Sequence, residues 1–206
     1  MFREIWFETD ERTEVAKALE MLERMLDLVV SDPYYWKWAI ITLHNAVQGA
    51  IVCSISGSAG LGALRPHIAT KWLKVYRAGT GDYPDLELDA FPNLYARMKV
   101  QFGYVPPSSV DESIAELNTF RNRFVHFVPA GWAIMANGLP GMARDCLGVV
   151  GDLAWDTRRF SWYDEDEGQR ARLHYERCLN LLERLHDTHF REETREAAQD
   201  DDETRG

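Results

Sequence analysis

The chain has 206 residues, of which 46% are hydrophobic and 27% charged, and its formal net charge at pH 7 is −10. This length suits one domain, or one domain with an appendage, and the apolar content is sufficient for a full core. The negative net charge argues against a protein that coats nucleic acid without specificity. The charge is uneven, however: residues 1–30 and 191–206 each have a net charge of −4, and residues 31–190 a net charge of only −2, so a local basic site can lie in the middle.

Helical periodicity predicts a first helix over residues 11–30 and a second over 33–56. The second segment is apolar almost all round, which is typical of the central helix of a bundle, and the polar residues that interrupt it argue against a membrane span. His44 and Gln48, one turn apart on one face, either bond to neighbouring helices in the core or form the wall of a cleft. The apolar stripe of the first helix consists of Val15, Leu19, Leu22, Leu26 and Val29.

Residues 57–107 predict a small helical insert, or a lid on the bundle. A Gly-rich loop leads into a short helix that carries Lys71 and Lys74 and no acidic residue. Trp72 and Tyr76 of this helix are four residues apart, and they either pack inward or stack on nucleic-acid bases. The two lysines are therefore candidate substrate-binding residues.

The stretch 111–128 predicts the helix around which the chain is organised, with Asp111 as its N-cap and an end just before Pro129. Arg121 falls in the middle of its apolar face, where an unpaired guanidinium is costly to bury. Arg121 must therefore have a fixed partner or face a cleft that is only partly dry. The apolar face consists of Ile114, Leu117, Phe124, Val125 and Val128, and a polar line beside it consists of Asn118, Asn122 and His126.

The spacing of Arg121, Asn122 and His126 has a chemical meaning. An arginine fork suits phosphate oxygens, a histidine can move a proton near neutral pH, and an asparagine can orient either one. Arg121 and His126 are about 140° apart around a straight helix, so one helix cannot easily aim both at one atom. A second copy of the helix packed face to face could do so. The alternative is a buried arginine bonded to a carbonyl and a histidine that merely finishes the helix.

The run Arg121-Asn122-Arg123-Phe124-Val125-His126 resembles the R-x4–6-H motif of the HEPN superfamily (higher eukaryotes and prokaryotes nucleotide-binding domains), which favours a polar residue directly after the arginine. The following stretches 127–132 and 138–140 resemble one bacterial branch of that superfamily, and the likeness covers roughly residues 12–190. Members are helical bundles that usually dimerise. Many are metal-independent ribonucleases, often toxins held by an antitoxin, and others have lost activity.

The resemblance implies roles for the residues of the motif. His126 would act as general acid or base, Arg121 would stabilise the charged phosphorane, and Asn122 would position the phosphate or the histidine. Candidate substrate-binding residues around them are Asn118, Arg123, His44, Gln48, Lys71 and Lys74.

After Pro129 the sequence predicts a hairpin or irregular loop with a turn at Asn137-Gly138, a helix over 140–160 and a last helix over 168–190. The acidic tail 191–206 is expected to be disordered. In the last helix His186 and His189 could bind a metal, but only Glu183 lies near that line. No metal site and no cofactor are therefore expected.

Three widely spaced cysteines (Cys53, Cys146 and Cys178) indicate a reducing compartment, because they are odd in number and lack a metal-binding spacing. The N-terminal residues contain no signal-peptide core, and no uncharged apolar run is long enough to span a membrane. A cytoplasmic protein that does not insert into membranes is expected.

Together these features predict an all-α protein: a HEPN-like bundle of four to five long helices with a small helical insert, in one domain over residues 1–190. The predicted function is metal-independent endoribonuclease cleavage of RNA through attack of the 2′-hydroxyl. The predicted partners are a second copy of the chain, the RNA substrate, and an antitoxin or other regulatory protein. The alternative is a catalytically silent HEPN-like dimer that serves as an interaction or nucleotide-binding module.

Overall fold

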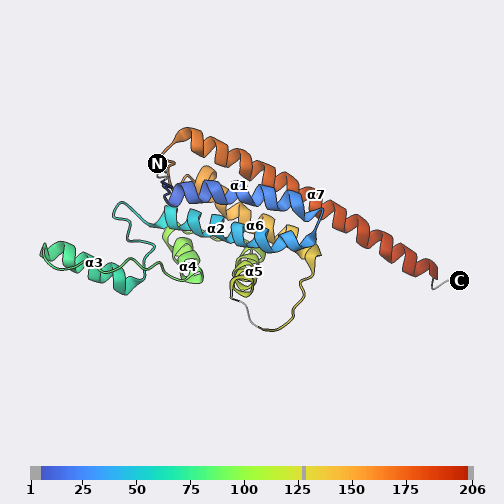
Figure 1. The fold of residues 1–206 in the computed structure, drawn as a ribbon, viewed down its shortest axis with the longest axis horizontal. Coiled ribbons are helices and arrows are strands. Elements are labelled where there is room, and N and C mark those ends of the chain that lie inside the picture. The colour runs from blue at the N-terminus through green and yellow to red at the C-terminus, as the bar shows by residue number, and fades with distance from the viewer. Residues whose placement is uncertain (1–5, 127–128, 204–206) are drawn as a thin grey trace, which may run out of the picture.

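Seven α-helices make up most of the part of the chain that the computed structural model describes, which is residues 6–126 and 129–203, with side chains up to residue 187. The predicted all-α class is confirmed (Figure 1), and the described residues form no strand beyond an isolated bridge between Leu64 and Leu88. The helices are α1 (Glu11–Val29), α2 (Trp36–Ile55), α3 (Pro66–Ala78), α4 (Phe91–Phe102), α5 (Ser108–Val125), α6 (Leu139–Gly151) and α7 (Glu165–Glu203).

The first two helices form an antiparallel pair along the bundle. Asp10 caps α1, since its side chain accepts hydrogen bonds from the backbone N–H groups of Arg12 and Thr13 at 2.8 and 2.9 Å. The five residues of the predicted stripe are all buried. The two backbones approach closely at Gly49, where an added Cβ would lie 2.7 Å from a methyl group of Val15. A glycine is therefore needed at this crossing.

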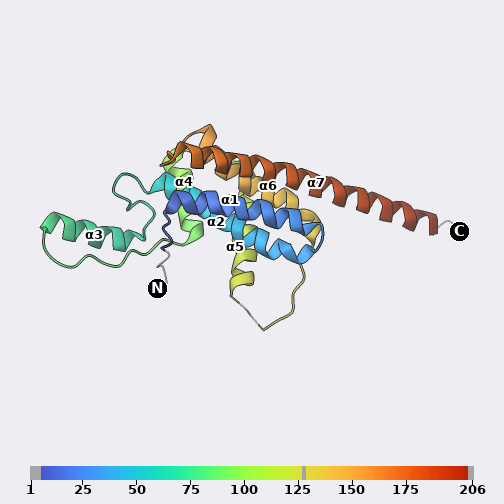
Figure 2. The same cartoon turned by 45° about the horizontal axis from the view of Figure 1, so that its top comes forward.

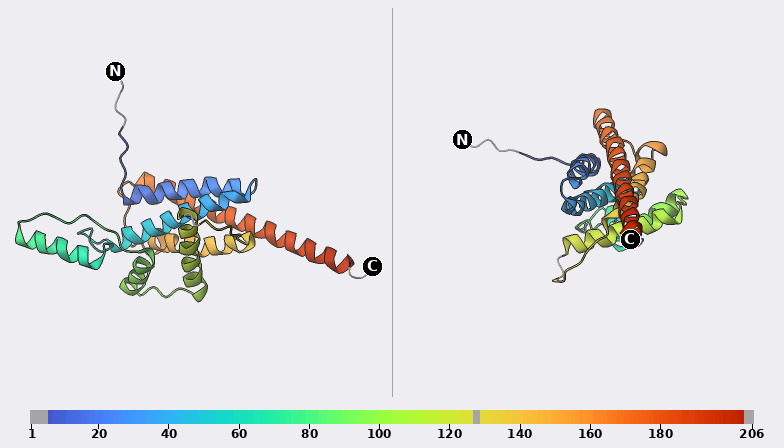
Figure 3. Two further views of the ribbon diagram at one scale, coloured as in Figure 1. Left: turned by 60° about the horizontal axis from the view of Figure 1, so that its bottom comes forward. Right: turned by 90° about the vertical axis from the view of Figure 1, so that its right-hand side faces the viewer.

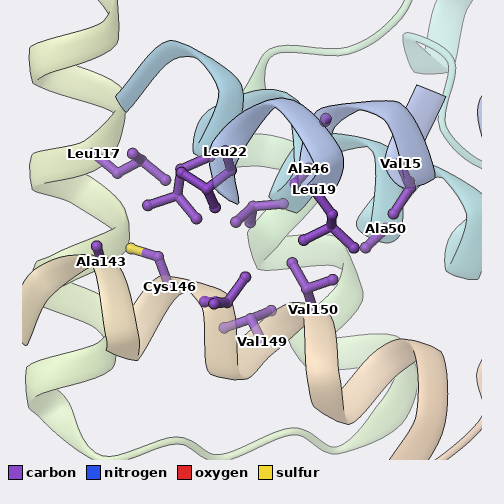
Figure 4. Close-up of a cluster of buried hydrophobic side chains, with 14 of the residues drawn as sticks. Val15, Leu19, Leu22, Ala46, Ala50, Leu117, Ala143, Cys146, Val149 and Val150 are labelled. Atoms are coloured by element: carbon purple, nitrogen blue, oxygen red, sulfur yellow. The ribbon is translucent and has the colours of Figure 1, made fainter. Parts of the chain in front are cut away.

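Helix α2 is the centre of the molecule, because it packs against α1, α4, α5 and α6. Its side chains meet those of α1, α5 and α6 in one dry core, part of which Figure 4 shows. By length and composition alone, the segment Pro33–Ile55 could cross a membrane, but the core helix of a bundle passes the same test. Most of that segment is buried against the other helices, as expected for the core helix of a soluble protein.

Helix α5 begins at Ser108, three residues before the predicted start, so the prediction of Asp111 as its N-cap was wrong. Asp111 lies in the first turn instead. Its carboxylate accepts hydrogen bonds from the Tyr95 hydroxyl at 2.8 Å and from the Lys99 ammonium at 2.7 Å, both on α4. The hydrogen bond from Lys99 and, to a smaller extent, that from Tyr95 hold the pKa of Asp111 below its usual range. The start of α5 is thus attached to α4.

The 57–107 region has two parts that behave differently. Helix α4 packs against α2 and belongs to the bundle, whereas α3 stands away from the other helices in both Figure 1 and Figure 2. At the base of this arm the backbone N–H groups of Arg65 and Asp89 donate to the carbonyls of Glu87 and Ala63, each at 3.0 Å. The arm therefore has a fixed base but does not cover the bundle as a lid.

The segments after α5 agree with the expectation only in part. The stretch after Pro129 forms an irregular loop with a 3₁₀ turn at Ala136–Gly138, which is the second of the two predicted alternatives, and it forms no hairpin in its described residues. Helix α6 ends at Gly151 and passes into a π-helical turn, Asp152–Asp156, instead of continuing to residue 160.

Helix α7 packs against α1 and α6, and its C-terminal part extends beyond the bundle (Figure 3). It runs to Glu203, through most of the tail that was expected to be disordered. Eight of the nine residues 191–199 are glutamate, arginine, alanine or glutamine, which all favour helix, and this outweighs the absence of an apolar stripe.

The stability of the bundle depends on the α1–α2 interface. Leu19 is fully buried, and Leu28 of the same helix is 37% exposed. Leu19→Ala should lower the free energy of unfolding by about 2–5 kcal/mol, because it leaves a cavity in a packed core. Leu28→Ala, the matched control, should cost about 1 kcal/mol or less. Urea unfolding followed by circular dichroism measures both, and equal losses would contradict the described core.

Candidate functional site

Arg121 lies on the side of α5 that faces the bundle, as its place in the apolar stripe predicted. Its side chain is half-buried, and its Nη1 donates a hydrogen bond to the Asn122 side-chain oxygen at 3.0 Å. Its Nε is buried and has no hydrogen-bond partner in the described part of the chain. Within the described part of the chain, most donors of the guanidinium are therefore left without a hydrogen-bond partner.

His44 of α2 lies within electrostatic reach of Arg121. The His44 side chain is only 2% exposed, and its ring lies 4.3 Å from the Phe91 ring of α4. Desolvation, followed by the positive charge of Arg121, lowers the pKa of His44 to about 4. The Asn118 side chain opposes this shift but does not form a regular hydrogen bond with the ring. His44 is therefore neutral at pH 7.

This placement resolves part of what the sequence left open for His44. It is a core residue, as the first alternative required, but neither of its ring nitrogens has a regular hydrogen-bond partner among the described residues. The charge of Arg121 acts on its ring, and whether His44 borders a substrate cleft stays a prediction. Gln48, one turn farther along α2, is half-buried. The two helices thus bring a permanent cation and a neutral imidazole together in the interior.

His126 lies just past the end of α5, where its backbone leaves the helix with φ −102° and ψ 92°. The helix therefore ends at Val125, earlier than the predicted residue 128. The side chain of His126 is exposed, and its backbone N–H donates to the Asn122 carbonyl at 2.9 Å. Asn122 thus contacts both ends of the motif: its side chain binds Arg121 and its backbone binds His126.

Arg121 and His126 of one chain point in different directions. Arg121 faces α2, and His126 is about 140° away around the helix on the solvent side. The predicted apolar face agrees with this only in its first half, since Ile114 and Leu117 are buried but Val125 is 39% exposed, and Val128 lies outside the described residues. Near the C-terminal end of α5, where the irregular loop begins, the apolar face of the helix is no longer buried against the bundle.

Arg123 lies on yet another side of α5, about 200° from Arg121. Its guanidinium carbon is 5.4 Å from the centre of the Trp132 ring. That ring also contacts Phe124 and Phe120, with centroid distances of 4.9 and 6.3 Å. Together with the start of α2 these residues border a pocket of about 310 Å³.

Sequence reasoning missed this pocket. Its lining comes from two regions that are far apart in the chain, 33–37 and 123–139. The one signal was the spacing of Phe120 and Phe124, four residues apart, which places two aromatic rings on one side of α5.

Lys71 and Lys74 lie on the projecting helix α3, away from α5 (Figure 1), so the structure does not bring them to Arg121. Both are exposed. The Trp72 ring stacks on Tyr76 at 5.5 Å and contacts Tyr83 at 4.9 Å, so these rings pack against one another on the arm. The separation follows from the insert, whose arm is joined to the bundle only at its base.

In the part of the chain with described side chains, no three His, Cys, Asp or Glu residues are grouped as a metal site would require. The side chain of His189 lies outside that part, and His186 is 3.9 Å from the adjacent Asp187. The three cysteines are free and buried. Burial raises the pKa of all three thiols, that of Cys53 to about 12, so none is a reactive thiolate at neutral pH.

The neutral state of His44 makes stability depend on pH. Its folded pKa of about 4 lies below the usual 6.5, so between these values the unfolded chain binds a proton that the folded chain excludes. The free energy of unfolding is therefore independent of His44 protonation above pH 6.5, and it decreases by about 3 kcal/mol as the pH falls from 6.5 toward 4.

The test compares wild type with His44→Gln, which cannot titrate. Their free energies of unfolding in urea should diverge between pH 7 and pH 4, with wild type losing about 3 kcal/mol more. Parallel pH profiles for the two proteins would show that His44 is not buried in the neutral form.

Comparison with known proteins was made on sequence and on structure. No protein-family model, no curated protein and no solved structure matches the chain. What the chain does is therefore inferred from the residues of this site and their surroundings.

Proposed function

We propose that the protein is a metal-independent endoribonuclease of HEPN type. The observation that carries the proposal is the hydrogen bond that the Arg121 guanidinium donates to the Asn122 side chain, close to the exposed side chain of His126 at the end of the same helix. A phosphate-binding cation, the amide that orients it and an exposed imidazole thus lie within the last turn of α5. The resemblance of residues 121–126 to the HEPN motif assigns the same three residues.

The electrostatics of Arg121 suit a phosphate ligand. Its neighbour His44 is neutral, and no carboxylate is among the contacts described for the guanidinium. The cation is therefore not neutralised by the protein, and a partly dry environment strengthens its attraction for a phosphorane.

In the proposed reaction His126 takes the proton from the ribose 2′-hydroxyl while the 2′-oxygen attacks the adjacent phosphorus. The bond from phosphorus to the 5′-oxygen then breaks, and that oxygen takes up a proton. Arg121 stabilises the additional negative charge of the phosphorane. The products are a 2′,3′-cyclic phosphate and a 5′-hydroxyl, so DNA is not a substrate.

A symmetric dimer completes the site. Within one chain Arg121 and His126 diverge, but two α5 helices around a two-fold axis can place Arg121 of one protomer next to His126 of the partner subunit. The exposed Val125 near the end of α5 gives that contact an apolar residue. In the cytoplasm such an enzyme would be restrained by an antitoxin or another regulatory protein.

A second candidate is a catalytically silent dimer that serves as an interaction or nucleotide-binding module. Two observations favour it: the separation of Arg121 from His126 in one chain, and the net charge of −10. In that case Arg121 is an anchor of the dimer interface.

Substitution of the motif separates the two candidates. Arg121→Ala and His126→Ala should each lower the rate of RNA cleavage by about 10² or more, since each removes one catalytic contribution. Fragments are measured on gels, and their ends by mass spectrometry, with RNA carrying 2′-methoxy groups as an uncleavable control. Activity should survive EDTA.

The matched control is Arg24→Ala, which removes an exposed arginine of α1 that pairs only with Glu20 among the described contacts. It should cleave as well as wild type. An enzyme reading is excluded if purified wild type cuts no RNA, or if His126→Ala cuts at the wild-type rate.

Mixing the two inactive variants tests the composite site. If each site combines residues of both protomers, co-refolded Arg121→Ala and His126→Ala chains should regain about a quarter of wild-type activity, because statistical mixing leaves one intact site in half of the dimers. Light scattering gives the oligomeric state of the same samples. A monomer at tens of micromolar, or no regain in a verified heterodimer, would contradict shared sites.

A further inference from the structure

The pocket beside Arg123 has a chemical character of its own. Among its lining residues are the aromatic Tyr34, Trp36, Phe124 and Trp132, and two cations, Lys37 and Arg123. Among the described residues that line it there is no acid. In a chain with a net charge of −10, a cavity bordered by the Arg123 guanidinium and by aromatic rings suits an anion that carries a flat apolar group.

The aromatic side chains that line the pocket are supported by packing against the rest of the protein. Phe124 lies between the pocket and the core, and Trp132 packs on Phe120 and Phe124 while staying 39% exposed. Trp36 is 4% exposed, and its indole nitrogen is buried without a hydrogen-bond partner among the described residues. Trp132 thus has a supported ring whose remaining surface is open to a ligand.

Arg123 connects this pocket with the motif. It is three residues before His126, so the two lie about 60° apart around the helix, on adjacent positions of one face. A ligand in the pocket with its anionic part on Arg123 therefore has that part next to His126. Arg121, on the opposite side of α5, does not line the pocket.

We propose that this pocket binds one unpaired nucleobase of the RNA, with the base against Trp132 and its phosphate on Arg123. The assignment rests on the proposed function for the identity of the polymer, and it adds the position at which the strand is gripped. A volume of about 310 Å³ is at the lower end of small-molecule sites and suits a single base. Stacking on an aromatic ring tolerates any base, so the pocket requires an unpaired nucleotide and not a particular sequence.

The experiment uses a short fluorescein-labelled RNA with 2′-methoxy groups throughout, which can bind but cannot be cut, and measures anisotropy. Trp132→Ala should weaken binding about five- to hundredfold, and Trp132→Phe should restore most of it, because the loss of one stacked base is of that size. Trp38→Ala removes a similarly exposed tryptophan of α2 that does not line the pocket, and it should bind as wild type does.

A scan with single abasic positions then locates the base. One position should weaken binding to wild type by the factor that Trp132→Ala causes, and the same abasic RNA should bind the Trp132→Ala protein no more weakly than intact RNA does. Arg123→Gln should lower the slope of log Kd against log salt by about 0.7, as expected when one contact to a single strand is lost. Thermal unfolding by circular dichroism verifies that each variant is folded.

Failure of this inference is distinct from failure of the proposed function. If RNA is cleaved in a motif-dependent way but Trp132→Ala and the abasic RNAs bind normally, the pocket is not a base site. If the pocket behaves as predicted but wild type cuts no RNA, the base site stands and the chain is a binding module. Additive losses for Trp132→Ala and the abasic position would overturn the stacking contact.

Discussion

Burial of a permanent cation where α5 meets α2 is the constraint on which the candidate site depends. An arginine in that place cannot be neutralised by a change of protonation, so the surroundings must adapt to it. The protein does so with a neighbour that can lose its own charge: His44 is kept neutral by burial and by Arg121. A lysine at residue 44 would place two charges against each other, and an apolar residue there would remove the one adaptable polar group.

The same constraint explains the role of the helix end. The side chain of Asn122 accepts a hydrogen bond from Arg121, and its carbonyl accepts the last backbone bond of the helix, from His126. The start of α5 is fixed separately, through Asp111 and its partners Tyr95 and Lys99. The helix is thus fixed at its first turn and carries its chemistry at its last, where Arg121 faces the bundle and Arg123 and His126 lie on the exposed side.

Much of the fold could be predicted from sequence because it follows from local pattern. The stripe of α1 has a clean helical period, and α4 lies between sequence signals for a helix start and end, Pro92 in its first turn and Gly103, which ends it in the left-handed conformation. The start of α5 could not be predicted in this way. Asp111 has the chemistry of an N-cap, but two residues of α4 take its carboxylate, and only the packed structure shows that competition.

For the site, the sequence predicted Arg121, Asn122 and His126 as a group and left His44 open between a core residue and the wall of a cleft. It could not tell which substrate-binding candidates lie close by. Lys71 and Lys74 are placed by the path of the insert, which carries them onto an arm away from α5. The aromatic pocket is likewise invisible in the sequence, because it exists only where the loop after α5 folds back toward the start of α2. Local pattern predicts elements, and long-range packing decides which of their side chains meet.

The central position of α2 has a consequence for synthesis of the chain. Helix α2 ends at residue 55, and α6, which covers another of its sides, ends at residue 151. At ordinary rates of translation the ribosome needs roughly five to twenty seconds to add those residues. In the first part of that interval, before α4 and α5 have been made, α1 is the one packing partner of this nearly all-apolar helix that the nascent chain already contains. The α1–α2 pair must therefore associate early and by itself, and the opposite side of α2 is a surface for chaperones, or for aggregation, until the later helices emerge.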